Sequence, residues 1–252
     1  MSRRRRLDAE LLRRGLVASR TQAAEAIELK RVLVNGAIAD KASRQVDPSD
    51  AVVIEGPPPR FVSRGGEKLD GALEGFGLSV VGMRVLDSGA STGGFTDCLL
   101  QRGASGVVAA DVGHGQLHPR IRGDSRVVVL ERFNVRDVKA ADIGGCVDAV
   151  VADLSFISLT RVIPALVGVC KPNGFMVLLV KPQFEAGRQE VSKVKGVIVD
   201  PAIHERVKGE VAQSLVESGC VIRGWMVSPL TGADGNREFL VYATVAGEGS
   251  HP

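Results

Sequence analysis

Apolar and polar positions follow two different patterns along the chain. Short apolar runs predict strands, and stretches in which apolar residues recur every three to four positions predict helices. From residue 61 onwards, strands are expected near residues 84–88, 106–111, 126–130, 148–153, 175–180, 221–227 and 238–245. Helices are expected near residues 64–76, 94–102, 159–169 and 201–218. This alternation predicts a doubly wound α/β fold around a mostly parallel sheet.

The first 60 residues follow a different pattern. Asp8 and Ser19 can each cap a short helix, and the second of these helices would turn Ala23, Ala24 and Ile27 inward. The apolar run 32–34 then predicts a strand that enters a tight turn at Asn35-Gly36. Two short helices followed by small strands predict a compact unit that is separate from the α/β domain.

The run Gly56-Pro57-Pro58-Pro59 is the clearest candidate linker. Consecutive prolines stiffen the backbone and exclude both a helix and a central strand. We therefore predict an N-terminal domain over residues 1–56, a linker over residues 57–62 and a larger domain over residues 63–252.

Charge is distributed unevenly between the two predicted domains. The chain has a net charge of +3, but residues 1–60 hold 12 Lys or Arg against 8 Asp or Glu. A basic module is typical of nucleic-acid binding, because Lys and Arg that meet phosphates release condensed counterions. A solubilising tail is the alternative interpretation of the same charges.

Cysteine spacing and hydropathy exclude several classes of protein. The four cysteines lie 24 to 50 residues apart, without the close pairs of a zinc site or a disulfide-rich scaffold, so we expect small buried side chains and no metal. The longest purely apolar run, Phe175 to Val180, is six residues, far below the roughly 18 that a membrane span needs. The arginine-rich N-terminus lacks the apolar core of a signal peptide. These features predict a cytoplasmic protein without a membrane partner.

A glycine-rich turn follows the strand predicted near residues 84–88. The turn runs Asp87, Ser88, Gly89, Ala90, Ser91, Thr92, Gly93, Gly94 and Phe95. Glycine lets a ligand approach the backbone closely, because it has no Cβ and adopts positive φ at little cost. The G-x-G-x-x-G spacing of a dinucleotide site is absent.

Two further strand ends contribute to the same predicted crevice. Asp111 ends the next strand, where a carboxylate can accept hydrogen bonds from a ribose of either NAD or S-adenosylmethionine. Asn134 and Val135 follow the third strand, where an adenine ring would lie; helix capping by Asn134 or Asp137 is the alternative. Ligands of open α/β sheets bind at this carboxyl edge.

Charged residues end the fourth and fifth predicted strands. Asp153 and Lys181 each follow an apolar run, where burial is costly unless the charge is paired, so each is the plausible partner of the other. A lysine whose pKa is lowered by neighbouring cations and by desolvation can act as a general base, a role worth roughly 10² to 10⁴ in rate. Such a base suits the removal of a proton from a ribose 2′-hydroxyl.

Several motifs, in order along the chain, resemble known families. Residues 5–54 resemble the S4 RNA-binding domain, and the turn from Asp87 resembles the first motif of class I methyltransferases. Residues 61–246 resemble the FtsJ-type RNA 2′-O-methyltransferases, and the whole chain resembles their TlyA (hemolysin A) branch, which has an N-terminal S4 domain. The matching segments are residues 63–69, 87–96, 110–117, 153–159, 181–184 and 235–239.

The resemblance implies a Rossmann-like sheet that binds S-adenosylmethionine and a Lys-Asp-Lys-Glu tetrad formed by Lys68, Asp153, Lys181 and Glu238. Lys181 is the implied base, Asp153 and Glu238 tune the lysines, and Lys68 steadies the alkoxide or the RNA backbone. The implied cofactor contacts are Asp87, the turn from Gly89 to Phe95, Asp111, Val112, Asn134, Val135 and Asp153.

The resemblance also implies a substrate, which is cytidine ribose in 16S and 23S ribosomal RNA of the ribosomal subunits. The RNA contacts expected are Arg4, Arg6, Arg20, Lys30, Arg31, Lys41, Arg64 and Arg188. The polar loop 185–196 is expected to close over RNA, with a merely mobile surface loop as the alternative. Three other functions remain open, namely an NAD-dependent oxidoreductase, a non-catalytic ribosome-assembly factor and a cytolysin. The oligomeric state is not predicted.

Overall fold

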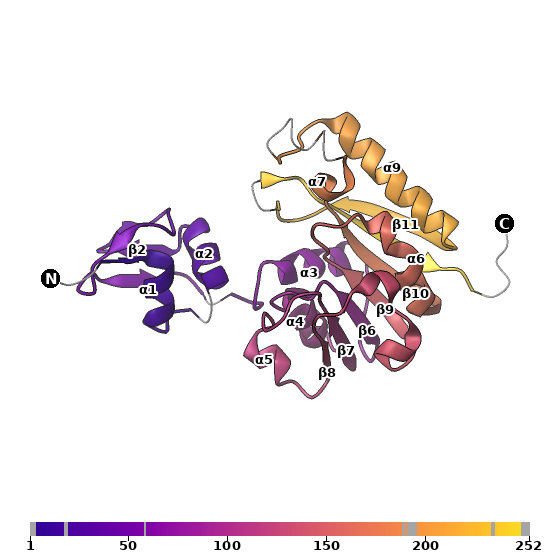
Figure 1. The fold of residues 1–252 in the computed structure, drawn as a ribbon, viewed down its shortest axis with the longest axis horizontal. Coiled ribbons are helices and arrows are strands. Elements are labelled where there is room, and N and C mark those ends of the chain that lie inside the picture. Colours follow the sequence, from indigo (N-terminus) through magenta and orange to yellow (C-terminus); the bar gives the residue numbers. More distant parts are fainter. Residues whose placement is uncertain are drawn as a thin grey trace. The chain divides into compact units, whose positions relative to one another are not determined.

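The computed structural model describes residues 4–17, 20–57, 59–187, 190, 196–232 and 235–247. Contacts within the chain divide it into two compact units, Met1–Arg60 and Phe61–Pro252 (Figure 1). The division falls next to the proline run, the segment predicted to be the linker.

The N-terminal unit packs two helices against small strands. In chain order its elements are β1 (Arg5–Arg6), α1 (Leu7–Arg13), α2 (Arg20–Glu28), β2 (Val32–Val34), β3 (Ala37–Ile38), β4 (Gln45–Val46) and β5 (Val52–Ile54). Strand β2 lies between β3 and β5 and is antiparallel to both, and β1 pairs with β4. The core of the unit includes the buried side chains of Leu7, Leu11, Ala23, Ile27 and Val32.

Two details of the N-terminal predictions change, and a third is not tested. Helix α1 begins at Leu7, so Asp8 lies inside its first turn, where it pairs with Arg6 at 3.0 Å instead of capping the helix. Ala24 is exposed and Ala26 takes the inward position, because Ala26 lies one helical turn after the buried Ala23 and next to the buried Ile27. Ser19 lies outside the described residues.

The larger unit is built on a seven-stranded sheet. Its strands are β6 (Arg84–Ser88), β7 (Gly106–Ala110), β8 (Val127–Leu130), β9 (Val147–Ala152), β10 (Cys170–Val180), β11 (Cys220–Val227) and β12 (Phe239–Val245). All seven predicted strands are confirmed, and β10 begins five residues earlier than predicted. The spatial order is β11-β12-β10-β9-β6-β7-β8, with β12 antiparallel to both of its neighbours. The strand order reverses between β6 and β9, which is where sheets of this kind bind ligands.

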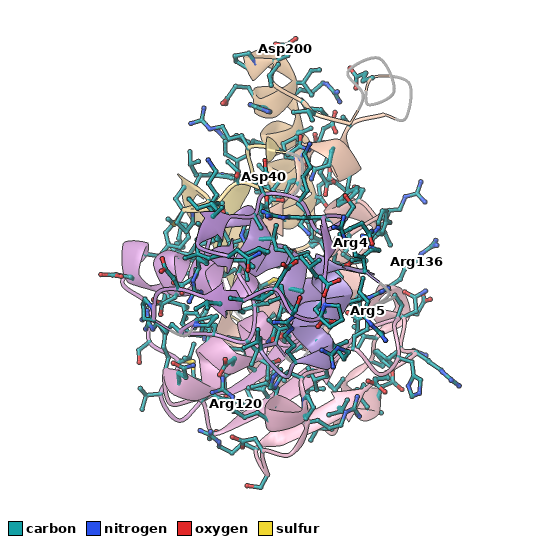
Figure 2. The ribbon with its side chains drawn as sticks, turned by 90° about the vertical axis from the view of Figure 1, so that its left-hand side faces the viewer. Arg4, Arg5, Asp40, Arg120, Arg136 and Asp200 are labelled. Carbon is teal, nitrogen blue, oxygen red and sulfur yellow. The ribbon has the colours of Figure 1, made fainter. Side chains whose placement is uncertain are left out.

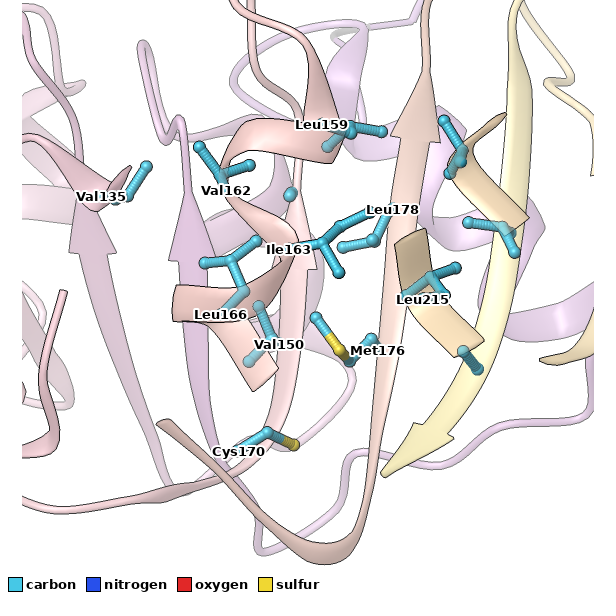
Figure 3. Packing of buried hydrophobic residues seen from close by; sticks show 14 of the residues in the cluster. Val135, Val150, Leu159, Val162, Ile163, Leu166, Cys170, Met176, Leu178 and Leu215 are labelled. Carbon is cyan, nitrogen blue, oxygen red and sulfur yellow. The ribbon is translucent and has the colours of Figure 1, made fainter. Parts of the chain in front are cut away.

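Helices cover both faces of this sheet. Helices α3 (Gly65–Gly75) and α4 (Gly94–Gln101) pack over one face, and α6 (Ile163–Val169) and α9 (Pro201–Glu217) pack over the other (Figure 1). In Figure 3, Ile163 and Leu166 of α6 lie against Met176 and Leu178 of β10. Successive strand residues alternate between the two apolar layers, as in a sheet that is buried on both sides.

Short turns of helix complete the unit. They are η1 (Val135–Asp137), η2 (Ala140–Ile143), α5 (Pro119–Arg122) and α7 (Pro182–Glu185), none of which has enough length to show a periodic pattern in the sequence. The helix predicted over residues 159–169 is divided into η3 (Leu159–Arg161) and α6, because Pro164 favours the first turn of a helix over its interior. Cys146 is exposed in the turn before β9, contrary to the expectation that all cysteines are buried.

Candidate active site

The carboxyl ends of β6, β9 and β10 meet at one edge of the sheet. The backbone N–H of Asp153 donates to the carbonyl of Ser88 at 3.0 Å, which fixes the end of β9 beside the glycine turn. On the other side, Val180 of β10 pairs with Phe239 of β12. Lys181 directly follows Val180, and Glu238 directly precedes Phe239. Because β10 and β12 are antiparallel, both residues lie at the same edge of the sheet as Asp153.

Lys181 and Asp153 form the first charged pair of the tetrad. Lys181 Nζ lies 2.5 Å from Asp153 Oδ1, and the side chains are 11% and 23% exposed. The same ammonium group donates to Ser155 Oγ at 3.0 Å. Two neighbouring oxygen atoms thus fix where the Lys181 amine lies.

Lys68 and Glu238 form the second pair. Lys68 Nζ donates to Glu238 Oε2 at 2.5 Å, and the two side chains are 10% and 2% exposed. A Cβ atom at Gly232 would lie 2.3 Å from Glu238 Oε1. Residue 232 is therefore glycine because the Glu238 carboxylate occupies the space that a side chain would need.

The two pairs are brought together by the first turn of α3. A Cβ atom at Gly65 would lie 3.7 Å from Asp153 Oδ2, so the beginning of α3 approaches the first pair. Lys68 follows Gly65 by three residues, which is about one helical turn. The four residues of the tetrad, which come from a helix and three strand ends, therefore gather at one place.

Two loops beside the tetrad are joined by side-chain contacts. The rings of Phe156 and Phe184 lie 5.2 Å apart, and Lys181 Nζ lies 5.7 Å from the Phe184 ring. Ser158 Oγ donates to Glu185 Oε2 at 2.5 Å, and the N–H of Leu159 donates to Glu185 Oε1 at 2.9 Å. Burial raises the pKa of Glu185, while these two hydrogen bonds oppose the shift. The contacts hold the loop after β9 against the loop after β10.

Phe156 stands out on the loop after β9. Its side chain is 91% exposed and its φ is +66°, a left-handed conformation that is uncommon for a bulky residue. Such backbone strain is characteristic of functional sites. An exposed aromatic ring held close to Lys181 offers a flat surface for a planar ligand.

The glycine turn between β6 and α4 is a candidate ligand-binding loop. Gly89 has a φ of +87°, and a Cβ there would lie 2.6 Å from the Asp153 carbonyl oxygen. Gly93 precedes α4, which begins at Gly94. Ala90, Gly93, Gly94 and Phe95 are buried, Thr92 is half-buried and Ser91 is exposed. Backbone at Gly89 and Ser91 is therefore the part of the turn that a ligand can reach most directly.

Asp87 lies beneath this turn and is completely buried. Its Oδ2 accepts a hydrogen bond from Thr96 Oγ1 at 2.6 Å. Burial raises the pKa of Asp87 to about 7, and the nearby Asp153 contributes in the same direction. Asp87 Oδ1 and Ser88 Oγ have no hydrogen-bond partner among the described residues. Asp87 therefore supports the turn from inside the domain, and its Oδ1 is a buried acceptor.

The other predicted cofactor residues occupy the next two strand ends. Asp111 accepts hydrogen bonds from Ser91 N–H at 2.8 Å and Gly113 N–H at 2.6 Å, which orient its carboxylate. Val112 is 70% exposed. Asn134 Oδ1 accepts from Arg136 N–H and so caps η1, as the alternative interpretation held. Val135 is buried in the core, so its side chain offers almost no surface to an adenine ring.

The predicted RNA contacts divide into exposed and structurally engaged residues. Arg4, Arg20, Lys30 and Lys41 are exposed, and Figure 2 shows Arg4 beside Arg5 on the N-terminal unit. Arg6 pairs with Asp8, Arg31 donates to the carbonyls of Glu55 and Pro57, and Arg64 donates to the Thr231 carbonyl. Arg188 and most of the loop near it lie outside the described residues.

Sequence reasoning missed several residues of this site. Ser155 and Gly232 carry no charge and occur in many loops, so only their contacts with Lys181 and Glu238 single them out. Phe156 was part of a matching segment, but its exposure could not be read from the pattern. Within the described residues, no group of three or more His, Cys, Asp or Glu side chains is arranged to hold a metal ion. In that same part of the chain, no helix has the length and apolar character needed to cross a membrane.

Comparison with known proteins identifies both units. Residues 61–245 match the FtsJ-like methyltransferase family, and residues 5–52 match the S4 domain. The chain is 51% identical to the 16S/23S rRNA (cytidine-2′-O)-methyltransferase TlyA of Mycobacterium tuberculosis, over 96% of this chain and 90% of the relative. It is 40% identical to Hemolysin A of Brachyspira hyodysenteriae, over 94% and 98% of the two chains. The structure of a putative hemolysin from Streptococcus thermophilus superposes with a TM-score of 0.78 at 39% identity, covering 98% and 90%.

Proposed function

The chain belongs to the FtsJ-like methyltransferase family, and from that premise we propose that it transfers methyl groups from S-adenosylmethionine to ribose 2′-hydroxyls of ribosomal RNA. The observation that carries the proposal is the convergence of Lys68, Asp153, Lys181 and Glu238 at the edge of the sheet that bears the glycine turn. The name of the relative that is 51% identical supports cytidine of 16S and 23S rRNA as the substrate. The S4 match supports RNA as the partner.

The residues around the glycine turn fit the proposed cofactor. The partly exposed backbone from Gly89 to Ser91 would receive the amino-acid part, and the oriented carboxylate of Asp111 would accept hydrogen bonds from the ribose hydroxyls. The accessible aliphatic surface of Val112 would pack on the adenine. When bound, S-adenosylmethionine supplies a methyl group on a positively charged sulfur.

Lys181 is the general base in this proposal. Only a neutral amine can take the proton of the 2′-hydroxyl, and Ser155 and Asp153 hold the nitrogen in place for that transfer. Once protonated, the Lys181 ammonium is stabilised by the Asp153 carboxylate 2.5 Å away. Lys68 remains paired with Glu238 and supplies a buried positive charge that stabilises the alkoxide as it develops.

The substrate nucleotide needs a surface to hold it once it leaves the RNA stack. Enzymes that act on a nucleotide commonly extrude it and stack its base on aromatic side chains. Phe156, exposed and held against Phe184, offers such a surface next to Lys181. The exposed basic residues of the S4-like unit supply contacts with RNA phosphates.

The test is methyl transfer to purified ribosomal subunits with tritiated S-adenosylmethionine, followed by nucleoside mass spectrometry. We expect label in 2′-O-methylcytidine, and we expect Lys181→Ala to reduce the rate by about 10² to 10⁴. Lys171→Ala is the matched control, because Lys171 lies on the same strand but pairs with Asp148 at the opposite edge. Absence of label from RNA, or full activity in Lys181→Ala, contradicts the proposal.

A further inference from the structure

A pocket lies beside the segment that contains Glu238 and leads into β12, on the side away from Lys68. It has a volume of about 370 Å³ and is formed by the beginning of α9, the end of β11 and the segment that leads into β12. Consecutive residues of an extended segment point to opposite faces. Glu238 points towards Lys68 on α3, whereas Arg237 and Phe239 line the pocket on the α9 side. The pocket and the tetrad are therefore separated by one thickness of backbone.

Aromatic rings and cations line this pocket. Lys208 Nζ lies 5.8 Å from the centre of the Trp225 ring and 5.5 Å from that of Phe239. The Arg237 guanidinium lies 5.7 Å from the Phe239 ring, and the edge of the His204 ring meets the same phenyl group. Phe239 is buried and forms the floor, whereas Arg237 is exposed at the rim.

The charge of the lining favours an anionic ligand. Among the described lining residues, Glu205 is the one acid, and its side chain pairs with Lys208 at 3.0 Å. Arg237 adds a second cation at the exposed rim. Rings that bind a flat group beside cations that bind a phosphate are the combination that single-stranded nucleic-acid sites use.

We propose that this pocket binds one nucleotide of the RNA substrate, next to the nucleotide that is methylated, with its base against Trp225 and its phosphate at Arg237. The proposal rests on the proposed function, because it takes RNA as the substrate. It adds a subsite on the α9 side of the segment that contains Glu238. The RNA strand would then pass over the edge of the sheet, with one nucleotide at the tetrad and the next in this pocket. This subsite contributes to RNA binding and takes no part in the proton or methyl transfer.

Trp225 provides a direct readout, because it is the single tryptophan of the chain. The full-length protein is titrated with a protein-free ribosomal RNA transcript, and RNA binding is followed in parallel by anisotropy of a dye on the RNA. We expect the fluorescence of Trp225 to be quenched in step with binding. Cytidine monophosphate is expected to quench it only at far higher concentration, because it lacks the contacts of the rest of the strand.

Kinetics with ribosomal subunits provide the second readout. Arg237→Gln and Trp225→Leu are expected to raise the KM for RNA about fivefold or more, with kcat and the Kd for S-adenosylmethionine unchanged. Arg223→Gln is the matched control, because Arg223 lies on the same strand as Trp225 but outside the pocket, where it donates to Thr244. If Trp225→Leu does not fold, the KM of Arg237→Gln and the Trp225 fluorescence of the wild-type protein still test the proposal.

Three results overturn the inference. They are saturated RNA binding without a change in Trp225 fluorescence, an unchanged KM in Arg237→Gln, and binding of the mononucleotide as tight as that of RNA. The failure of the proposed function is a different result, namely that the wild-type protein transfers no methyl group to RNA. If the protein methylates RNA but the Trp225 fluorescence does not change on RNA binding, the proposed subsite is wrong and the proposed function stands.

Discussion

At the scale of single residues, the site depends on charges that are paired where they are buried. Lys68 with Glu238, and Lys181 with Asp153, each place an ammonium group 2.5 Å from a carboxylate. Removing one partner of such a pair leaves an uncompensated charge, which is more costly than the pair itself. Uncharged neighbours that leave room for the pairs are therefore as necessary as the charges.

Gly232→Ala tests that requirement. The new methyl group would overlap the Glu238 carboxylate, so we expect Glu238 to move away from Lys68 and methyl transfer to fall by about tenfold or more. Methylation rates of Gly232→Ala and of Gly209→Ala are compared, because Gly209 has open space around its Cα. Equal activity of the two variants would show that the position of Glu238 is not critical.

Asp87→Asn tests the buried carboxyl group below the glycine turn. Burial raises the pKa of Asp87 to about 7 from an ordinary 3.8, so between these values the folded state holds a proton that the unfolded chain has lost. This group therefore makes the free energy of unfolding fall as pH rises from about 4 to 7. We expect Asp87→Asn to remove that contribution in denaturant titrations followed by Trp225 fluorescence. A variant with the same pH dependence as the wild-type protein would contradict the shifted pKa.

At the scale of elements, short loops after β9 and β10 carry two of the proposed catalytic groups and also hold one another in place. Ser155 contacts Lys181, Phe156 contacts Phe184, and Ser158 contacts Glu185. Catalytic side chains on loops need such support, because a displacement of about 1 Å costs a large part of the rate. Glu185 is a positioning residue, since its carboxylate bonds to Ser158 and Leu159 and only its backbone N–H reaches Lys181, at the carbonyl oxygen.

Glu185→Ala and Glu185→Gln separate positioning from charge. Gln can still accept from the N–H of Leu159 and donate to Ser158, whereas Ala loses both contacts. We expect kcat to fall about tenfold in Glu185→Ala and to recover in Glu185→Gln, with little change in the KM for RNA. A low kcat in both variants would indicate that the charge of Glu185 itself is required.

The sheet was predictable from the sequence because its strands are short apolar runs with well-marked ends. Asp153 and Lys181 could be found for the same reason, since each is a charge that directly follows such a run. Lys68 and Glu238 came from the family resemblance, because a lysine on a helix and a glutamate before a strand are ordinary features. Phe156, Ser155 and Gly232 depend on tertiary contacts, which no local pattern records.

At the scale of the whole molecule, the chain combines a basic module with a methyltransferase unit. The S4-like unit has an exposed arginine-rich beginning, while other arginines stabilise its fold. Arg13 and Arg14 pair with the buried Glu10 at 2.6 and 2.8 Å, and these pairs lower the pKa of Glu10 to about 2. The module therefore uses arginine in two ways, as ion-pair partners of the buried Glu10 and as exposed side chains such as those of Arg4 and Arg20.

Salt dependence distinguishes the two sets of arginines. We expect Arg4→Gln combined with Arg20→Gln to weaken RNA binding and to reduce the slope of log Kd against log salt by about two, since about one counterion is released per phosphate contact. The unfolding free energy is expected to remain close to that of the wild-type protein, because both side chains are exposed. An unchanged salt slope in the double variant would place the RNA contacts on other residues.

The pH dependence of the single-turnover methylation rate of ribosomal subunits tests the assignment of Lys181 as the base most directly. Lys181→Arg keeps a positive charge that can pair with Asp153, but a guanidinium cannot give up its proton in this pH range. We expect the wild-type rate to rise with pH towards a plateau, and Lys181→Arg to be inactive at every pH at which Lys171→Arg is active. A wild-type rate independent of pH, or substantial methylation by Lys181→Arg, would contradict that assignment.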